Sequence, residues 1–398
     1  MSLRAGLAAL SPQIAPIAAI TLFGISLAMS YPLFGLMLER TGASGTMIGL
    51  NTAAAAIAMV AGAPVMPLLL RRFGFGPLMI AAALVLAVAM LAVPLYQGFW
   101  YWTVVRLIYS FAATVLFFTS EYWIVAAAPE LSRGRIIAVY ALFVSGGFAL
   151  GPMILGLTGL EGFLPFAAAA GVVLVGLVPI LWGLSSAPET GDEDPPSPFA
   201  ALGVFVTDPG VVIAVVLFGT IEFGAMALIT VWGVRSGMSE ADAVILLAVF
   251  ALGAMVLQLP LGWATDRFDR RRLLAVIAAG SAIAPLALAA AGPAYWLMIA
   301  CVAFWGAISV GLYSVALTEM GARYRGGKLA VANAAVILGY GVGALMSPVV
   351  FGFAMDTIPP DGLLYASAAM ALAYLALVLA RMFRAQKPPR YLLTGRDR

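Results

Sequence analysis

The chain has 398 residues, of which 63% are hydrophobic and only 10% are charged. Soluble domains are about 45–50% apolar and about 25% charged, so this composition cannot cover a water-exposed surface. One cysteine and no histidine exclude an internal disulfide, a Cys/His zinc site and a Ser-His-Asp triad. We therefore expect a membrane protein that is not an enzyme and that uses no metal or cofactor.

Apolar runs of about 20 residues, the length that a membrane-spanning helix needs, recur along the chain. Lipid permits only helices or closed barrels, and barrel strands would alternate in runs of about 10 residues. The pattern predicts an all-α integral membrane protein with twelve transmembrane helices. They are placed at residues 13–38, 45–70, 76–96, 100–127, 135–158, 162–184, 209–233, 241–264, 273–291, 294–319, 328–355 and 362–380. The first run is too long, and too closely followed by others, for a cleavable signal peptide.

A hydrophilic stretch separates the sixth predicted helix from the seventh. Residues 185–208 include Glu189, Asp192, Glu193 and Asp194 together with several prolines, a composition typical of a flexible linker. The chain is thus predicted to consist of an N-terminal six-helix bundle (1–184), a cytoplasmic linker (185–208) and a C-terminal six-helix bundle with a basic tail (209–398).

Lysine and arginine are distributed unequally between the two sides of these helices. With both termini on one side, 18 of the 21 basic residues lie on that side, Arg40 and Arg235 lie on the other, and Arg106 falls within a helix. The positive-inside rule then predicts a cytoplasmic (inner) membrane protein with both termini in the cytoplasm. The basic loops would face lipid headgroups, so the net charge of +3 does not indicate a nucleic-acid partner.

The two predicted bundles are related by an internal repeat. At a shift of 195 residues, Arg40-Thr-Gly-Ala-Ser44 aligns with Arg235-Ser-Gly-Met-Ser239, and Arg72-Phe73 aligns with Arg267-Phe268. Two parallel six-helix repeats place a substrate path at their interface, near the middle of the bilayer. The repeat therefore favours a transporter.

Charged turns follow the second and eighth predicted helices. The later turn, 262–272, contains Asp266 among several arginines, and an acid in this setting can pair with helix ends and hold one conformation. The earlier turn has Arg71 where Asp266 would be expected. Such turns can also serve only as topology anchors. The candidate cytoplasmic gate consists of Asp266, Arg267, Arg270, Arg71, Arg72 and Arg133.

The fifth predicted helix carries the pattern Gly147-x-x-x-Gly151-Pro152-x-x-x-Gly156. Glycines at this spacing let another helix approach closely, and a proline bends its own helix. We expect a helix-packing motif here.

These motifs resemble those of the major facilitator superfamily. The turn at 262–272 is similar to its loop signature, Arg106-Leu-Ile-Tyr109-Ser110 to its fourth-helix arginine motif, and the Gly-Pro pattern to that of its proton-driven exporters. A closer resemblance, to the YcaD-type branch of bacterial inner-membrane transporters, covers nearly the whole chain. It is carried by Glu121, Arg133-Gly-Arg135, Tyr140, the turn 72–75, Ala332-Asn-Ala334 and Gly339-Tyr340-x-x-Gly343. The resemblance implies secondary transport but no particular substrate.

Three ionisable residues fall well within the predicted helices: Arg106, Glu121 and Glu222. A rise of about 1.5 Å per residue places Arg106 and Glu222 each about 10 Å from the outer surface, and Glu121 about 22 Å deeper, at the cytoplasmic mouth. We expect Arg106 and Glu222 to pair and Glu222 to carry a proton, although the pair could also be static and structural. The aromatic candidates for the substrate cavity are Tyr31, Tyr109, Trp305 and Tyr313; packing or an interfacial belt is their alternative role.

The predicted function is proton-coupled efflux of a small organic molecule by alternating access. A nucleotide is not expected as the energy source, because Ala322 and Leu329 replace the Gly and Ser/Thr that a P-loop around Lys328 would need. Proton-coupled uptake is the first alternative. A non-transporting membrane assembly or sensor protein is the second, and the cost of charges inside the bilayer argues against it.

Overall fold

A computed structural model of the chain describes residues 3–127, 133–187, 203–205, 207–292, 294–324 and 327–385. These residues are almost entirely helical. The first group of helices is α1 (Leu3–Arg40), α2 (Gly45–Gly62), α3 (Met66–Phe73), α4 (Phe75–Ala92), α5 (Phe99–Ala127), α6 (Arg133–Thr158) and α7 (Leu164–Gly183). The second group is α9 (Pro209–Arg235), α10 (Glu240–Arg267), α11 (Arg270–Ala290), α12 (Tyr295–Arg323), α13 (Gly327–Thr357) and α14 (Gly362–Ala385).

The prediction of an all-α membrane protein is confirmed. Among the described residues, 11 helical segments are long and apolar enough to cross a membrane, and α6 adds the apolar stretch Leu142–Thr158. The helix predicted at 45–70 is interrupted by a 3-10 turn at Ala63–Val65 that separates α2 from α3. Pro64 explains the break, because it lacks a backbone N–H and its ring crowds the preceding turn. Most of the predicted linker, residues 188–202, lies outside the described residues.

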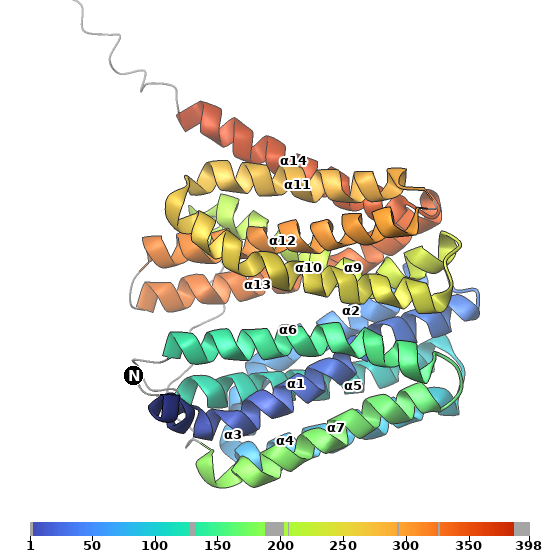
Figure 1. The fold of residues 1–398 in the computed structure, drawn as a ribbon, viewed down its shortest axis with the longest axis vertical. Coiled ribbons are helices and arrows are strands. Elements are labelled where there is room, and N and C mark those ends of the chain that lie inside the picture. Colours follow the sequence, from blue (N-terminus) through green and yellow to red (C-terminus); the bar gives the residue numbers. More distant parts are fainter. Residues whose placement is uncertain are drawn as a thin grey trace, which may run out of the picture.

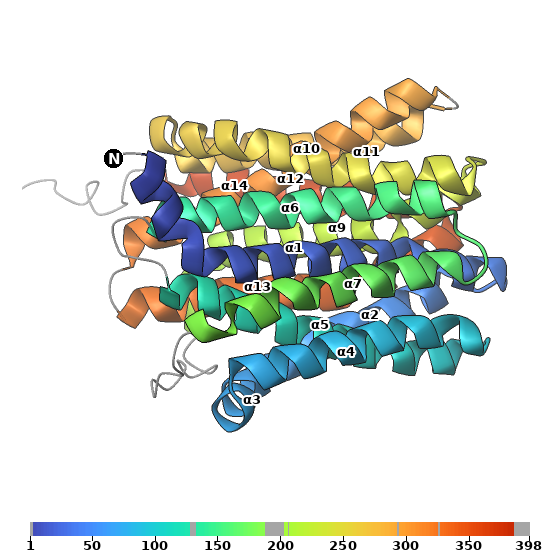
Figure 2. The same ribbon diagram turned by 60° about the horizontal axis from the view of Figure 1, so that its bottom comes forward.

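The long helices run side by side, with α11, α12 and α14 in the upper part of Figure 1 and α4, α5 and α7 in the lower part. We call the end at which α1 begins, α7 ends and α9 begins the linker end, and the opposite end the distal end. In Figure 2, α1, α6 and α9 lie between α10 and α11 on one side and α4 and α5 on the other. The middle of the molecule is therefore formed by helices of both groups.

Each group packs mainly on itself, and helix pairs among the described residues join the groups. Within the groups, α1 packs on α6 and α7, and α9 packs on α13 and α12; between them, α2 packs on α13 and α9, α6 on α10 and α1 on α9. Helices α9, α12 and α13 lie next to this junction. Side chains from the middle of these helices are thus positioned near the boundary between the groups.

The glycines of α6 determine how closely it approaches α1. A Cβ atom at Gly147 would lie 2.6 Å from the Thr21 carbonyl oxygen, and one at Gly151 would lie 2.6 Å from the Ile25 carbonyl oxygen. Gly156 differs from the prediction, since no atom lies within 4 Å of its Cβ position. The close contact therefore involves only the first two glycines of the motif, because the five residues from Gly151 to Gly156 turn the helix by about 140° and place Gly156 on another face.

Gly151→Val should lower the free energy of unfolding by about 1–3 kcal/mol, because the new side chain would overlap α1 and force the two helices apart. Gly156→Val, in the same helix, should stay within about 0.5 kcal/mol of wild type. Thermal unfolding of the detergent-solubilised variants measures both. Equal losses for the two variants would show that valine disturbs α6 itself rather than its packing on α1.

Candidate substrate and proton site

Glu222 lies at the midpoint of α9, 13 residues from Pro209 and 13 from Arg235. At about 1.5 Å per residue, each end of the helix is about 20 Å away. The side chain lines a cavity of about 270 Å³ together with Phe218, Tyr313, Ile337 and Tyr340. Helices α9, α12 and α13 therefore place one half-buried carboxyl group at mid-length of the helices, facing this cavity.

Aromatic rings form most of the wall around this carboxyl group. The Tyr340 hydroxyl donates a hydrogen bond of 2.9 Å to Glu222 Oε2. The Phe218 ring centroid lies 5.5 Å from that of Tyr313 and 6.0 Å from that of Tyr340. Negative ring faces beside a carboxyl group form an environment that attracts a cation or a proton.

Arg106 is held by the N-terminal helices rather than by Glu222. Its guanidinium Nη1 donates to Asn51 Oδ1 at 3.0 Å, and its Cζ lies 4.9 Å from the Phe34 ring centroid and 5.8 Å from the Tyr31 ring centroid. The salt bridges among the described side chains do not include an Arg106–Glu222 pair. The expectation of that pair was therefore wrong for this conformation.

The difference in depth explains why the pair does not form. Counting from the first residue of α9 and assuming a core of about 30 Å placed Glu222 near the outer surface. However, α9 has 27 residues and is about 40 Å long, so Glu222 is central. Arg106, 7 residues after Phe99 at the start of α5, is only about 10 Å from the distal end.

The amide that binds Arg106 was not recognised from the sequence. Asn51 is fully buried, and its Nδ2 donates to Thr103 Oγ1 at 3.0 Å. An asparagine in an apolar helix was the available signal, because a polar group in lipid must find a partner. Arg106 and Asn51 thus join α5 to α2 inside the N-terminal group.

The predicted aromatic residues have different environments. Tyr313 lines the Glu222 cavity, whereas Tyr31 lies edge-on to Phe223, 5.9 Å between centroids, and close to Arg106. The Tyr109 hydroxyl bonds to Ser26 Oγ at 3.1 Å, which ties α5 to α1. Trp305 is fully buried against Phe250, away from the residues that line the cavity. Tyr109 and Trp305 therefore have packing roles, and only Tyr313 of the four lines this cavity.

Glu121 is an exposed residue of α5. It lies 22 residues after Phe99, which places it about 33 Å from the distal end of the helix and towards the linker end. This agrees with the depth expected for a residue at the mouth of the path. It is therefore a weaker candidate than Glu222 for a buried proton site.

Three of the predicted gate residues have described contacts, and these lie within their own group of helices. Arg270 Nη1 pairs with Glu319 Oε2 at 3.1 Å, both in the C-terminal group. Arg267 lies over the Trp263 ring at 4.3 Å. Arg72 lies over the Phe73 ring at 5.6 Å, and Arg71 is exposed. The side chains of Asp266 and Arg133 lie outside the described residues.

Among the side chains that the structure describes, polar contacts between the two groups are found at the distal end. Arg235, the last residue of α9, makes a bidentate pair with Glu39 of α1, with Nε–Oε1 at 2.9 Å and Nη2–Oε2 at 2.8 Å. Arg40 makes a second pair across the boundary, with Glu240 at the start of α10. These are the two arginines that the repeat aligns, but the repeat does not align their acidic partners, because Val234 aligns with Glu39 and Gly45 aligns with Glu240.

Asp356 of α13 adds a backbone contact across the same boundary. It accepts hydrogen bonds from the N–H groups of Gly45 and Thr46 at 2.6 and 2.8 Å, and from the Thr46 hydroxyl at 2.6 Å. A carboxylate from one group of helices thus caps the start of α2 in the other, where the helix dipole favours negative charge. The distal end is held closed by these contacts.

Comparison with known proteins agrees with this architecture. The family model of the Major Facilitator Superfamily matches residues 17–255 and 236–397. The chain belongs to the major facilitator superfamily. It is similar to the MFS-type transporter YfkF of Bacillus subtilis (strain 168), with 25% identity over 370 residues, covering 91% of this chain and 93% of that one. It is also similar to YcaD of Escherichia coli O6:K15:H31 (strain 536 / UPEC), with 24% identity over 384 residues, covering 95% and 97%.

Solved structures share the fold at lower identity. The nucleoside transporter NupG superposes with a TM-score of 0.74 at 14% identity, covering 96% of this chain and 99% of that one. The D-xylose–proton symporter superposes with a TM-score of 0.70 at 16% identity, covering 97% and 99%. The predicted membership of the superfamily is thus confirmed, and the protein is a multi-pass membrane transporter.

Proposed function

We propose that the protein exchanges protons for a small organic cation across the cytoplasmic membrane, with the linker end in the cytoplasm. The observation that supports this most is the position of Glu222: a single carboxyl group at mid-helix, facing a cavity with three aromatic rings. Arg106 is the basic residue that was predicted to neutralise Glu222, but its guanidinium group donates a hydrogen bond to Asn51. The carboxyl group is therefore available to a proton or to a cationic substrate.

Competition for one carboxyl group leads to exchange. An unpaired carboxylate is costly inside a low-dielectric protein, so the conformational change should proceed only when Glu222 is neutralised by a proton or by the substrate. Proton and cation bind in turn and cross in opposite directions. With the proton gradient directed inward, the organic cation leaves the cell.

The volume of the cavity and its aromatic walls further restrict the size and the charge of the substrate. A volume of about 270 Å³ is below the lower limit of about 300 Å³ for typical small-molecule pockets, so the substrate should be small. Phe218, Tyr313 and Tyr340 offer ring faces to a flat or alkylated ammonium group. An anionic substrate would be repelled by the carboxylate and by the negative faces of the rings.

Everted membrane vesicles carrying the full-length protein provide the test. An organic ammonium compound and its neutral isostere of equal size are added separately, with a lumenal pH-sensitive dye. The cation should accumulate inside and make the lumen less acidic, whereas the isostere should do neither. Equal uptake of the two compounds would overturn cation selectivity. Faster entry of the cation into intact cells that carry the protein would indicate uptake symport instead.

A further inference from the structure

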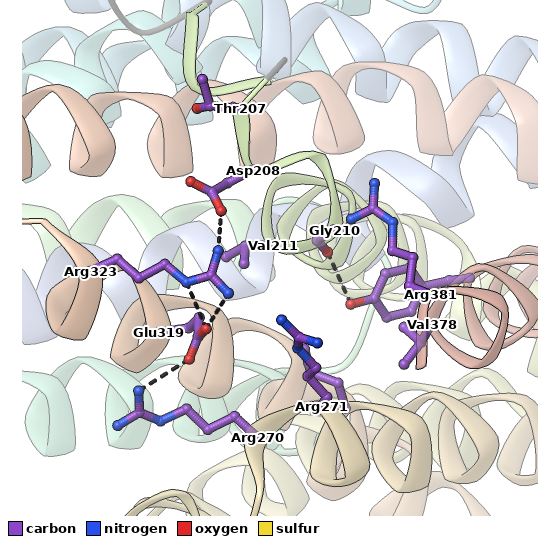
Figure 3. Close-up of a pocket in the computed structure, with 12 residues that line it drawn as sticks. Thr207, Asp208, Gly210, Val211, Arg270, Arg271, Glu319, Arg323, Val378 and Arg381 are labelled. Carbon is purple, nitrogen blue, oxygen red and sulfur yellow. Dashed lines mark hydrogen bonds and ion pairs between the residues drawn. The ribbon is translucent and has the colours of Figure 1, made fainter. Parts of the chain in front are cut away.

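A second pocket, of about 330 Å³, lies at the linker end of the C-terminal helices, among α9, α11, α12 and α14 (Figure 3). Its lining shares no residue with the Glu222 cavity. Four arginines and two acids carry its charge, which leaves a formal excess of two positive charges (four minus two). They are Arg270, Arg271, Arg323, Arg381, Asp208 and Glu319.

The two acids are already used by the lining itself. Glu319 accepts hydrogen bonds from Arg270 at 3.1 Å and from Arg323 Nε at 2.7 Å. Asp208 pairs with Arg323 and accepts the Tyr324 hydroxyl. This chain of contacts links the start of α9 to α11 and α12. Both carboxylates of the pocket are therefore already paired with arginines. The site is consequently held in shape without an added ligand.

Two guanidinium groups remain in excess. Within the described part of the chain, no ion pair joins Arg271 or Arg381 to an acid, and both side chains are exposed. In Figure 3 neither side chain has a dashed contact, and Arg381 extends past Gly210. Their charge is available to an anion that enters the pocket.

The start of helix α9 increases the positive potential at the same place. The start of a helix carries partial positive charge, and α9 starts at Pro209, whereas the start of α11 is already capped by the Asp269 carboxylate, which accepts a hydrogen bond of 2.9 Å from the Arg272 N–H. A Cβ atom at Gly210 would lie only 2.5 Å from Arg381 Nη1, so this guanidinium rests against the first turn of α9. A cation at this position is unfavourable until an anion joins it.

We propose that this pocket binds a phosphate group, presented by an anionic phospholipid headgroup or as free phosphate. Guanidinium groups form paired hydrogen bonds with phosphate oxygens, and helix starts bind phosphate through backbone N–H groups. The pocket also has a buried floor, formed by Val211, Leu274, Tyr374 and Val378, that can cover the carbon part of a headgroup. Basic pockets between helices at a membrane surface are suited to anionic headgroups.

The test uses the full-length protein and Arg271→Gln/Arg381→Gln. Binding is followed by native mass spectrometry and by thermal stabilisation, with phosphatidylglycerol, phosphatidylcholine or inorganic phosphate added separately. At about 1 kcal/mol for each arginine near the surface, the double variant should bind the anionic probe roughly 30-fold more weakly. Each single variant should show a loss of about fivefold, which keeps the test informative if the double variant folds poorly.

Arg72→Gln/Arg267→Gln is the matched control. It removes the same charge at the linker end from two exposed arginines that do not line the pocket, and it should keep wild-type binding of the anionic probe. Binding of phosphatidylglycerol alone would identify the headgroup as the source, and binding of inorganic phosphate would identify a soluble ligand. Equal weakening by both double variants, or binding of neither anion by wild type, would overturn the proposal.

Discussion

Glu222→Gln is expected to abolish proton-coupled accumulation of substrate. The amide can still accept the Tyr340 hydrogen bond of 2.9 Å, so the cavity should keep its shape, but it cannot exchange a proton. Exchange of one proton for one monovalent cation moves no net charge, so the pH difference alone drives it, and a difference of about two pH units can support a substrate ratio of up to about 100-fold. In the variant this ratio should fall to about 1. Reconstituted vesicles with a labelled substrate and a pH-sensitive dye measure both movements.

Two controls separate coupling from folding. Glu121→Gln removes an acid from α5 that is exposed and does not line the cavity, and it should retain coupled transport. Tyr340→Phe keeps the carboxyl group and should remain coupled although it loses the hydrogen bond. If Glu222→Gln still concentrates substrate while Glu121→Gln does not, the coupling carboxyl group is Glu121 and the proposed exchange at Glu222 is wrong.

Arg235→Ala should shift the protein away from the conformation that is closed at the distal end. The arginine bonds to Glu39 and lies 3.5 Å from Asp356, so its loss leaves two carboxylates close together without a cation. The side chains of Arg235 and Glu39 are 19% and 20% exposed, so their pair is neither a weak surface pair nor a fully buried one. We expect the substitution to destabilise the distally closed conformation by about 1–2 kcal/mol, which is roughly a tenfold change in the open-to-closed ratio.

Distances between spin labels provide the measurement. Labels at Gln97→Cys and Ala294→Cys, in exposed distal turns of the two groups, are introduced on a Cys301→Ser background. In Arg235→Ala, the distribution of distances between the two labels should gain a component at longer distance. Arg270→Ala is the matched control, because it breaks a pair with Glu319 that lies within one group. A longer distal distance in both variants, or in neither, would contradict the assignment of Arg235 as a distal lock.

The Arg106 result shows which part of the site could be predicted. An arginine within a membrane helix has to find a polar partner, so its burial followed directly from the sequence. Its partner did not, because Glu222 was chosen from a depth estimate that took α9 to be about 30 Å long, whereas its 27 residues span about 40 Å. The structure supplies Asn51 instead. A one-dimensional count gives distance along a helix, but not its vertical position or its rotation.

At the distal end too, the sequence identified the charged residues but not their partners. Arg40 and Arg235 were recognised as aligned residues, and their loops were placed on the same side of the membrane. Their partners, Glu240 and Glu39, belong to the opposite groups of helices and are about 200 positions apart in the chain. Pairing over this separation depends on the packing of α1 against α9. No local pattern in the sequence encodes it.

The sequence by itself determined the helical membrane architecture, because a chain with 63% hydrophobic residues in runs of about 20 must satisfy its backbone hydrogen bonds inside lipid. It also determined the repeat, the superfamily and the presence of charged residues within the helices, where burial in lipid is energetically costly. Only the tertiary structure decided which partner each charge has. Contacts such as Tyr340 with Glu222, Arg235 with Glu39 and the basic pocket around Arg381 arise where helices from distant parts of the chain meet. Their positions depend on tilt and rotation, which packing sets and hydropathy does not encode.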